Sequence, residues 1–337
     1  MALSCLPKNG LSATEKQLKQ QSKSGLVSAQ RMMSAAGSTP NGAMMMAPAE
    51  LLESRDTPWA RACAILPQLQ RGRKMENSAW GITKAHDDYA EGVQMMKLLR
   101  KKNGNKKARE EPLSTTFITN DLLRDERSFY MDCEDFQQKT FKGWSTVNFG
   151  AGTVKEPVPK VAETKGWSVA LKAMEVTIRH WILNGFLCLY SATAFENTLH
   201  SLNCAVDSIE WSMMQCPNTP TAERGIFEHA FLRGVMRLRL KAYTKARKMK
   251  GPKSGYTLQG LISLAQDLID NADTNPPSET TSDTHVGFLF SFWAHHKAGA
   301  YSALAYAYLQ MAMKSAGKMP RSTRHQAESS RCYKTAI

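Results

Sequence analysis

Apolar residues recur at helical spacing along most of the chain from about residue 50 onward. The strongest pattern covers residues 165–203, where apolar side chains become almost continuous around the helix from Ile182 to Ala194. A helix that is apolar on all sides is typical of the centre of a protein core. Gly185 is a candidate point of division within it. Helical spacing assigns five of its residues to the core: Val169, Ala173, Val176, Trp181 and Leu183.

The same spacing, together with start and stop signals, predicts further helices at residues 84–102, 222–250, 257–272 and 286–314. The first ends at an Asn-Gly-Asn turn (103–105), and the second at Gly251-Pro252, a common end signal. Thr257 is placed to cap the third, because its hydroxyl group can accept a hydrogen bond from the first helical turn.

Strand signals are few and lie in the middle of the chain. The segments STTFIT (114–119) and KGWSTVNF (142–149) contain β-branched and aromatic residues, which favour short strands. We therefore expect a small strand-bearing insertion at about residues 110–160, and we find no internal repeat of solenoid length. The predicted fold class is mainly α.

The two ends of the chain differ in composition from its middle. Residues 1–49 contain no aromatic residue and are rich in Ser, Ala, Gln, Lys, Gly and Met. Such a segment buries too little apolar surface to offset its ordering entropy, which predicts a flexible basic N-terminal arm. Residues 50–316 are expected to form the helical body, and residues 317–337 a loose basic C-terminal tail.

The formal net charge of +14 is concentrated in a few segments. Residues 1–49, 94–109, 233–253 and 314–337 carry net charges of +4, +7, +9 and +5, which makes +25. The rest of the chain therefore carries −11. An acidic body with segregated basic segments is typical of a protein that presents basic surfaces to an acidic polymer.

One predicted helix places apolar and basic residues on opposite sides. A helical wheel of residues 231–250 gives one apolar stripe that we expect to face the core: Phe231, Val235, Leu238, Ala242, Ala246 and Met249. Five cations form a ladder on the other side: Arg233, Arg237, Lys241, Lys245 and Lys248. Like charges four residues apart destabilise a helix by roughly 0.2–0.5 kcal/mol per pair. No acidic residue lies within 233–253 to relieve them.

Three interpretations of this basic ladder remain open: a solvated helix face, a membrane-surface or calmodulin-type helix, and a phosphate-contacting face. The alanines of the apolar stripe suit close helix packing better than membrane insertion, and only Phe231 is a clear bulky anchor. Nucleic acid is therefore the favoured partner.

A second basic segment, 97–109, surrounds the Asn-Gly-Asn turn and contains no aromatic residue. A solvated loop or a localisation signal is the alternative here. As an RNA contact it predicts electrostatic, sequence-independent binding without base stacking. The residues predicted to contact RNA are Lys97, Arg100, Lys101, Lys102, Lys106, Lys107, Arg109, Arg233, Arg237, Arg239, Lys241, Lys245, Arg247, Lys248 and Lys250.

No catalytic motif for phosphate-loop, dinucleotide, serine-hydrolase or zinc-protease chemistry occurs in the sequence. The acidic cluster Asp132, Glu134 and Asp135 is more typical of an exposed helix start than of a metal site. His200 and Cys204 share a helix face, but zinc needs two more ligands, and the nearest candidates are Cys216 and His229. We expect no enzyme activity, no metal and no cofactor.

Seven scattered cysteines without C-x-x-C spacing favour a reducing compartment. The longest apolar run, 286–313, is interrupted centrally by His295, His296 and Lys297, which a membrane span would bury at high cost. We expect an intracellular protein without a membrane partner, and a polar seam at His295-His296 where helices or subunits pack.

The layout of the whole chain resembles the coat proteins of cryptic viruses with double-stranded RNA genomes (partitiviruses). The likeness lies in the basic arm, a helical body around the long apolar helix 166–203, the short strand-bearing insertion and the 18 methionines, which suit adaptable packing. The resemblance implies a helix-rich shell-type domain, a homodimer as building block of an icosahedral capsid, RNA packaged in the virion, assembly in the host cytoplasm and no enzyme activity. The alternative is the nucleoprotein of a segmented negative-strand RNA virus, which forms rings or filaments.

Overall fold

Helices make up 87% of the residues that the computed structural model describes, and none of these residues lies in a strand. The described residues are 56–72, 74, 77–101, 111–130, 150–189, 194–217, 220, 224–252, 254–276, 286–315 and 319–336. All of them belong to one compact unit, Ala47–Ile337. The prediction of a mainly α fold is confirmed. The predicted N-terminal arm, 1–49, lies outside the described residues.

The first helices are α3 (Pro58–Arg71), α4 (Ala79–Lys101), α5 (Glu111–Asp125) and the short 3-10 turn η2 (Glu126–Ser128). α4 and α5 pack antiparallel, since Arg124 lies 2.6 Å from Asp88 at one level and Ile118 packs against Gly92 at another. The Cβ that Gly92 lacks would lie only 2.8 Å from a side-chain carbon of Ile118, so glycine permits this close approach.

The predicted strand at 114–119 is wrong, because these residues form the middle of α5. The Thr119 hydroxyl group donates to the carbonyl oxygen of Thr115, 2.8 Å away, and it accepts a 2.5 Å bond from Nη1 of Arg179. Tertiary packing thus overrides the β-propensity of this short segment. The other described residues of the predicted insertion at 110–160 lie mainly in the rest of α5, in η2, in α7 (Ala151–Lys155) and in the first residues of α8 (Val158–Lys165), and none of them lies in a strand. The segment 142–149 lies outside the described residues.

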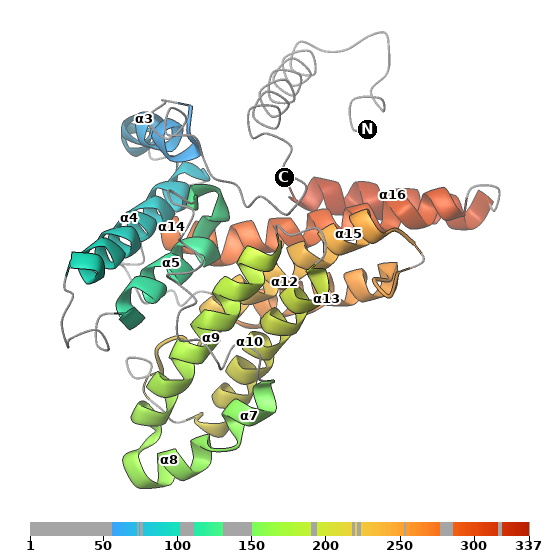
Figure 1. Ribbon diagram of the computed structural model, residues 1–337. Helices are drawn as coiled ribbons and strands as arrows, with labels where there is room; N and C mark the ends of the chain where they lie inside the picture. Colours follow the sequence, from blue (N-terminus) through green and yellow to red (C-terminus); the bar gives the residue numbers. More distant parts are fainter. Residues whose placement is uncertain are drawn as a thin grey trace. The chain divides into compact units, whose positions relative to one another are not determined.

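The long apolar segment forms two helices, α9 (Trp167–Leu189) and α10 (Phe195–Gln215), which lie side by side (Figure 1). The expected division at Gly185 is wrong. Gly185 lies within α9, where its missing Cβ would meet Leu202 of α10 at 2.8 Å. Glycine therefore brings the two helices together instead of separating them.

The core assignment on α9 is confirmed for its second half only. Trp181 and Leu183 are fully buried, as are most residues up to Leu189. Val169 and Ala173 are exposed and Val176 is only half-buried, and the first half of α9 instead buries Ala170, Leu171, Met174 and Ile178.

The last part of the chain contains α12 (His229–Lys250), α13 (Leu258–Thr274), α14 (Val286–Leu289), the π-helical segment η4 (Phe290–Ala294) and α15 (His295–Lys314). Two predicted boundaries are confirmed. α12 ends at Gly251, which has a positive φ of 74°, and the Thr257 side chain caps α13 by accepting a bond from the Gly260 N–H. Within the described residues, no helix is long and apolar enough to cross a membrane.

The expected loose tail at 317–337 is wrong for its described part, which forms α16 (Met319–Ala336). α16 packs antiparallel to α15 (Figure 1): Ser329 donates to the carbonyl oxygen of Ala305, and Ser322 donates to that of Ala312. The small residues of α15 allow this approach, so a polar, basic segment is held by a few buried side chains.

The basic helix α12 occupies a central place. It contacts α5, α9, α10, α13, α15 and η4. A helix surrounded on this many sides has little solvent-facing surface, and this decides the environment of its cations.

Candidate nucleic-acid interface

The apolar stripe of α12 is placed as predicted for five of its six residues. Phe231, Val235, Leu238, Ala242 and Ala246 are buried. Met249 is 56% exposed, because it lies in the last turn of α12, beyond the packed part of the helix.

Arg233 lies inside the protein and holds neighbouring elements together. Only 4% of it is exposed. Its guanidinium group donates to the carbonyl oxygen of Phe292 at 2.9 Å, and to the Asn271 side chain and the Asn275 carbonyl at 3.2 Å each. Arg233 therefore connects α12 to η4 and to the end of α13.

Arg237 is also buried, and it forms the centre of an ionic cluster. Its Nη1 lies 2.5 Å from Oε2 of Glu126, and its Nη2 donates to the carbonyl oxygen of Leu122. Lys241 reaches the other carboxylate oxygen of Glu126 at 2.6 Å. Burial raises the pKa of Glu126, but Arg237 and Lys241 outweigh it and lower that pKa to about 2. Glu126 thus neutralises part of the repulsion on α12.

Two further cations of α12 have structural partners, and a third lies in the field of two carboxylates. Arg247 donates to the carbonyl oxygen of Gly251, where the helix ends. Lys250 lies 3.1 Å from Glu196 at the start of α10. Burial lowers the pKa of Arg239, while the carboxylates of Glu210 and Asp267 act in the opposite direction.

The expectation of a five-residue ladder facing outward is therefore wrong for Arg233 and Arg237, and Arg247 is buried as well. The physical reason is the central position of α12. Its basic side packs against α5, η2, η4 and α13, which supply carbonyl oxygens and one carboxylate to these guanidinium groups.

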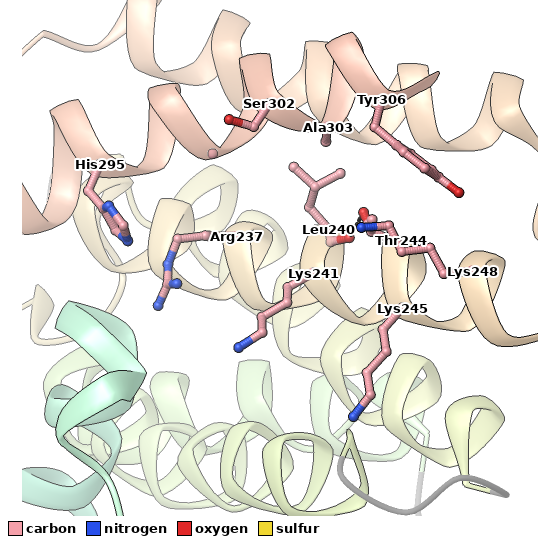
Figure 2. Close-up of a pocket in the computed structure, with 11 residues that line it drawn as sticks. Arg237, Leu240, Lys241, Thr244, Lys245, Lys248, His295, Ser302, Ala303 and Tyr306 are labelled. Atoms are coloured by element: carbon pink, nitrogen blue, oxygen red, sulfur yellow. Dashed lines mark hydrogen bonds between the residues drawn. The ribbon is translucent and has the colours of Figure 1, made fainter. Parts of the chain in front are cut away.

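The rest of the ladder borders an open groove of about 420 Å³ between α12 and α15 (Figure 2). The residues that line it are Arg237, Leu240, Lys241, Thr244, Lys245, Lys248, His295, Gly299, Ser302, Ala303 and Tyr306. Three lysines and one arginine thus lie along one wall, four residues or fewer apart. Within the described part of the chain, no carboxylate is among the lining residues.

Lys248 is the most exposed of the three lysines. The Lys241 side chain is 39% exposed, Lys245 is half-buried and Lys248 is exposed. Lys245 donates to the carbonyl oxygen of Leu189 at 2.8 Å. Burial and the neighbouring Lys241 lower the pKa of Lys245, so positive charge is crowded at this point. The Lys248 ammonium group lies 4.7 Å from the ring centre of Tyr306, and Figure 2 shows its side chain extending toward that ring.

The second predicted RNA-binding segment, Lys97 to Arg109, is described only as far as the backbone of α4, which ends at Lys101. The side chains of Lys97, Arg100 and Lys101, and all of Lys102, Lys106, Lys107 and Arg109, lie outside the described residues. The same holds for Asp132, Glu134 and Asp135.

The structure does not assemble a metal site from the residues that it describes. The His200 ring lies 3.7 Å from Sγ of Cys204, one turn away on α10. His296 is fully buried and stacks on Phe292, with ring centres 5.8 Å apart. The expected polar seam is thus an internal packing contact at His296.

Sequence reasoning missed two residues of this region. Glu126 lies far from α12 in the sequence, and no local pattern connects the two. Tyr306 falls in an apolar run, where an aromatic residue is normally read as core. No protein family model matches the chain, and no curated protein or solved structure matches it.

Proposed function

We propose that this protein binds RNA through phosphate contacts at the α12–α15 groove and acts as a viral coat protein that self-assembles around its RNA. The observation that carries the RNA contact is the groove itself. It is open, the exposed Lys248 and the half-buried Lys241 and Lys245 line it, and no carboxylate is among its lining residues within the described part of the chain. Such a wall favours a polyanion.

The charge distribution of the whole sequence supports the same partner. The 97–109 segment adds seven cations without an acid, while the remainder of the chain outside the basic segments is acidic. The coat assignment rests on the layout of the sequence and on the helical fold. The proposal includes assembly from homodimers, sequence-independent binding and no catalytic residue.

A second candidate is the nucleoprotein of a segmented negative-strand RNA virus. The observation that favours it is that three lysines of α12, Lys241, Lys245 and Lys248, line one groove. Electron microscopy of the purified protein with RNA separates the two candidates. Closed isometric particles support the coat protein, and rings or flexible filaments support the nucleoprotein.

The RNA contact is tested by the salt dependence of binding. Each phosphate contact changes the slope of log K against log salt by about 0.7–0.9. Replacing Lys245 and Lys248 together by Gln should therefore reduce the slope by about 1.4–1.8. The matched control replaces Lys160 and Lys165, two exposed lysines of α8, by Gln. An equal reduction of this slope in both double variants, or an unchanged slope in both, would contradict RNA binding at the groove.

A further inference from the structure

The groove is the size of a small-molecule site and is too small to hold a double helix. Its volume of about 420 Å³ falls within the range of small-molecule pockets, roughly 300–1,000 Å³. Its walls are two α-helices that pack against each other. An RNA duplex is a rigid body whose bases are already stacked inside it, so it cannot place a base on Tyr306, which is half-buried in the groove.

The lining matches the separate parts of a nucleotide. Lys248, exposed near the end of α12, offers positive charge to the groove, whereas the Lys245 ammonium group donates to the carbonyl oxygen of Leu189. Leu240 and Ala303 add apolar surface, and Ser302 adds a hydroxyl group. Tyr306 contributes an aromatic ring beside Lys248. Aromatic rings stack on bases that are not already stacked within a duplex.

We propose that the groove takes a single-stranded segment of RNA, with a phosphate held by Lys248 and the attached base stacked on Tyr306. This inference rests on the proposed RNA binding and specifies the strand that occupies the site. The Lys248 ammonium group then moves from the ring face to the phosphate, and the base takes the place over the ring. Duplex RNA binds instead to exposed basic residues elsewhere on the protein.

The test compares a short unstructured RNA with a blunt duplex of the same length, by fluorescence anisotropy at one salt concentration. Tyr306→Leu keeps apolar bulk and removes the ring. It should weaken single-strand binding by about 5-fold to 150-fold, the range for loss of one stacked base, and leave duplex binding within about 2-fold. The matched control is Tyr333→Leu, at an exposed tyrosine of α16 that does not line the groove. It should leave the binding of both RNAs unchanged.

A second variant keeps the test independent of any folding defect in Tyr306→Leu. Lys248→Gln replaces an exposed side chain, so the fold should persist, and it should weaken single-strand binding more than duplex binding. Equal losses for the two RNAs, or unchanged single-strand binding in both variants, would overturn the inference while RNA binding itself stands. If neither RNA binds the wild-type protein, the proposed function fails as well.

Discussion

Glu126 of η2 and Arg237 of α12 form an ion pair of 2.5 Å in which both side chains are largely buried, 13% and 8% exposed. The two residues come from distant parts of the sequence, and Lys241 completes the cluster. A buried charge that loses its partner keeps its desolvation cost. The pair therefore makes the placement of α5 and η2 against α12 sensitive to single substitutions.

Arg237→Gln should lower the free energy of unfolding by about 3 kcal/mol, near the lower end for breaking a buried pair, because Lys241 still faces Glu126. Urea denaturation at neutral pH measures the change. The control is Lys248→Gln, on the same helix but exposed, and it should stay within about 0.5 kcal/mol of the wild type. Equal stability of the two variants would show that the pair contributes nothing.

The apolar side of α12 makes a second prediction. Leu238 is 1% exposed, so Leu238→Ala should cost about 2–5 kcal/mol, the usual range for truncating a buried leucine. Met249→Ala on the same helix removes an exposed side chain and should change stability by less than about 0.5 kcal/mol. Thermal melting of both variants provides the comparison, and a similar loss for Met249→Ala would contradict the burial pattern.

Gly185 is predicted to be intolerant of even one methyl group. A Cβ at this position would lie 2.8 Å from Leu202 and 3.3 Å from the carbonyl oxygen of Thr198. Gly185→Ala should therefore force α9 and α10 apart and destabilise the protein by about 1–3 kcal/mol, as overpacking does. Gly299→Ala, within α15 and with open space around its Cβ, should instead stabilise the helix by up to about 1 kcal/mol. In chemical denaturation, Gly185→Ala should lower the free energy of unfolding and Gly299→Ala should raise it.

Acid should weaken the packing of α15 through His296. Burial lowers the pKa of this ring well below its ordinary value of 6.5, and Arg237, His295 and Arg233 lower it further. Below pH 6.5 the unfolded chain therefore binds a proton at this position that the folded chain does not. The free energy of unfolding then falls as the pH falls, by up to about 1.4 kcal/mol per pH unit from this one group.

The pH effect of His296 is isolated by comparing the wild type with His296→Leu between pH 7 and 5. The comparison is needed because Asp121 acts in the opposite direction: burial raises its pKa well above 3.8, so its protonation favours the folded chain as the pH falls. Asp121 is present in both proteins and cancels. The wild type should lose more stability than the variant over this range, and parallel pH profiles would contradict the prediction.

The sequence was sufficient wherever the determining interaction was local. Thr257 and Gly251 mark helix ends through bonds and backbone angles within a few residues, and both boundaries were predicted. The buried stripe of α12 follows from helical spacing alone. Val169 shows the limit of spacing, since a residue in phase with the core is still exposed where no neighbouring helix covers it.

Interactions between distant segments were not predictable in this way. The ladder of α12 meets no acid within its own helix, which favours a surface position, whereas Glu126 neutralises part of it from η2. The threonines of 114–119 favour strand locally, but Arg179 of α9 binds Thr119 and Asn120 in the helical arrangement. In both cases the partner lies too far away in the sequence to contribute to a local pattern.

The π-helical segment η4 determines how the helix from Val286 to Lys314 can change length. The His295 N–H bonds to the carbonyl oxygen of Phe290, five residues back instead of four, so this turn holds one residue more than an α-helical turn. Five residues of a π-helical turn rotate the chain by about as much as four residues of an α-helix, so deleting one residue here would restore a regular α-helix and leave α14 and α15 in the same phase. Deleting one residue between His295 and Ala300, within regular α15, would instead rotate the two parts of the helix by roughly 100°. Phe292 could then no longer stay buried while Ala300 and Ala307 keep their contacts. The π-helical turn can therefore lose one residue without a change of phase, whereas the regular part of α15 cannot.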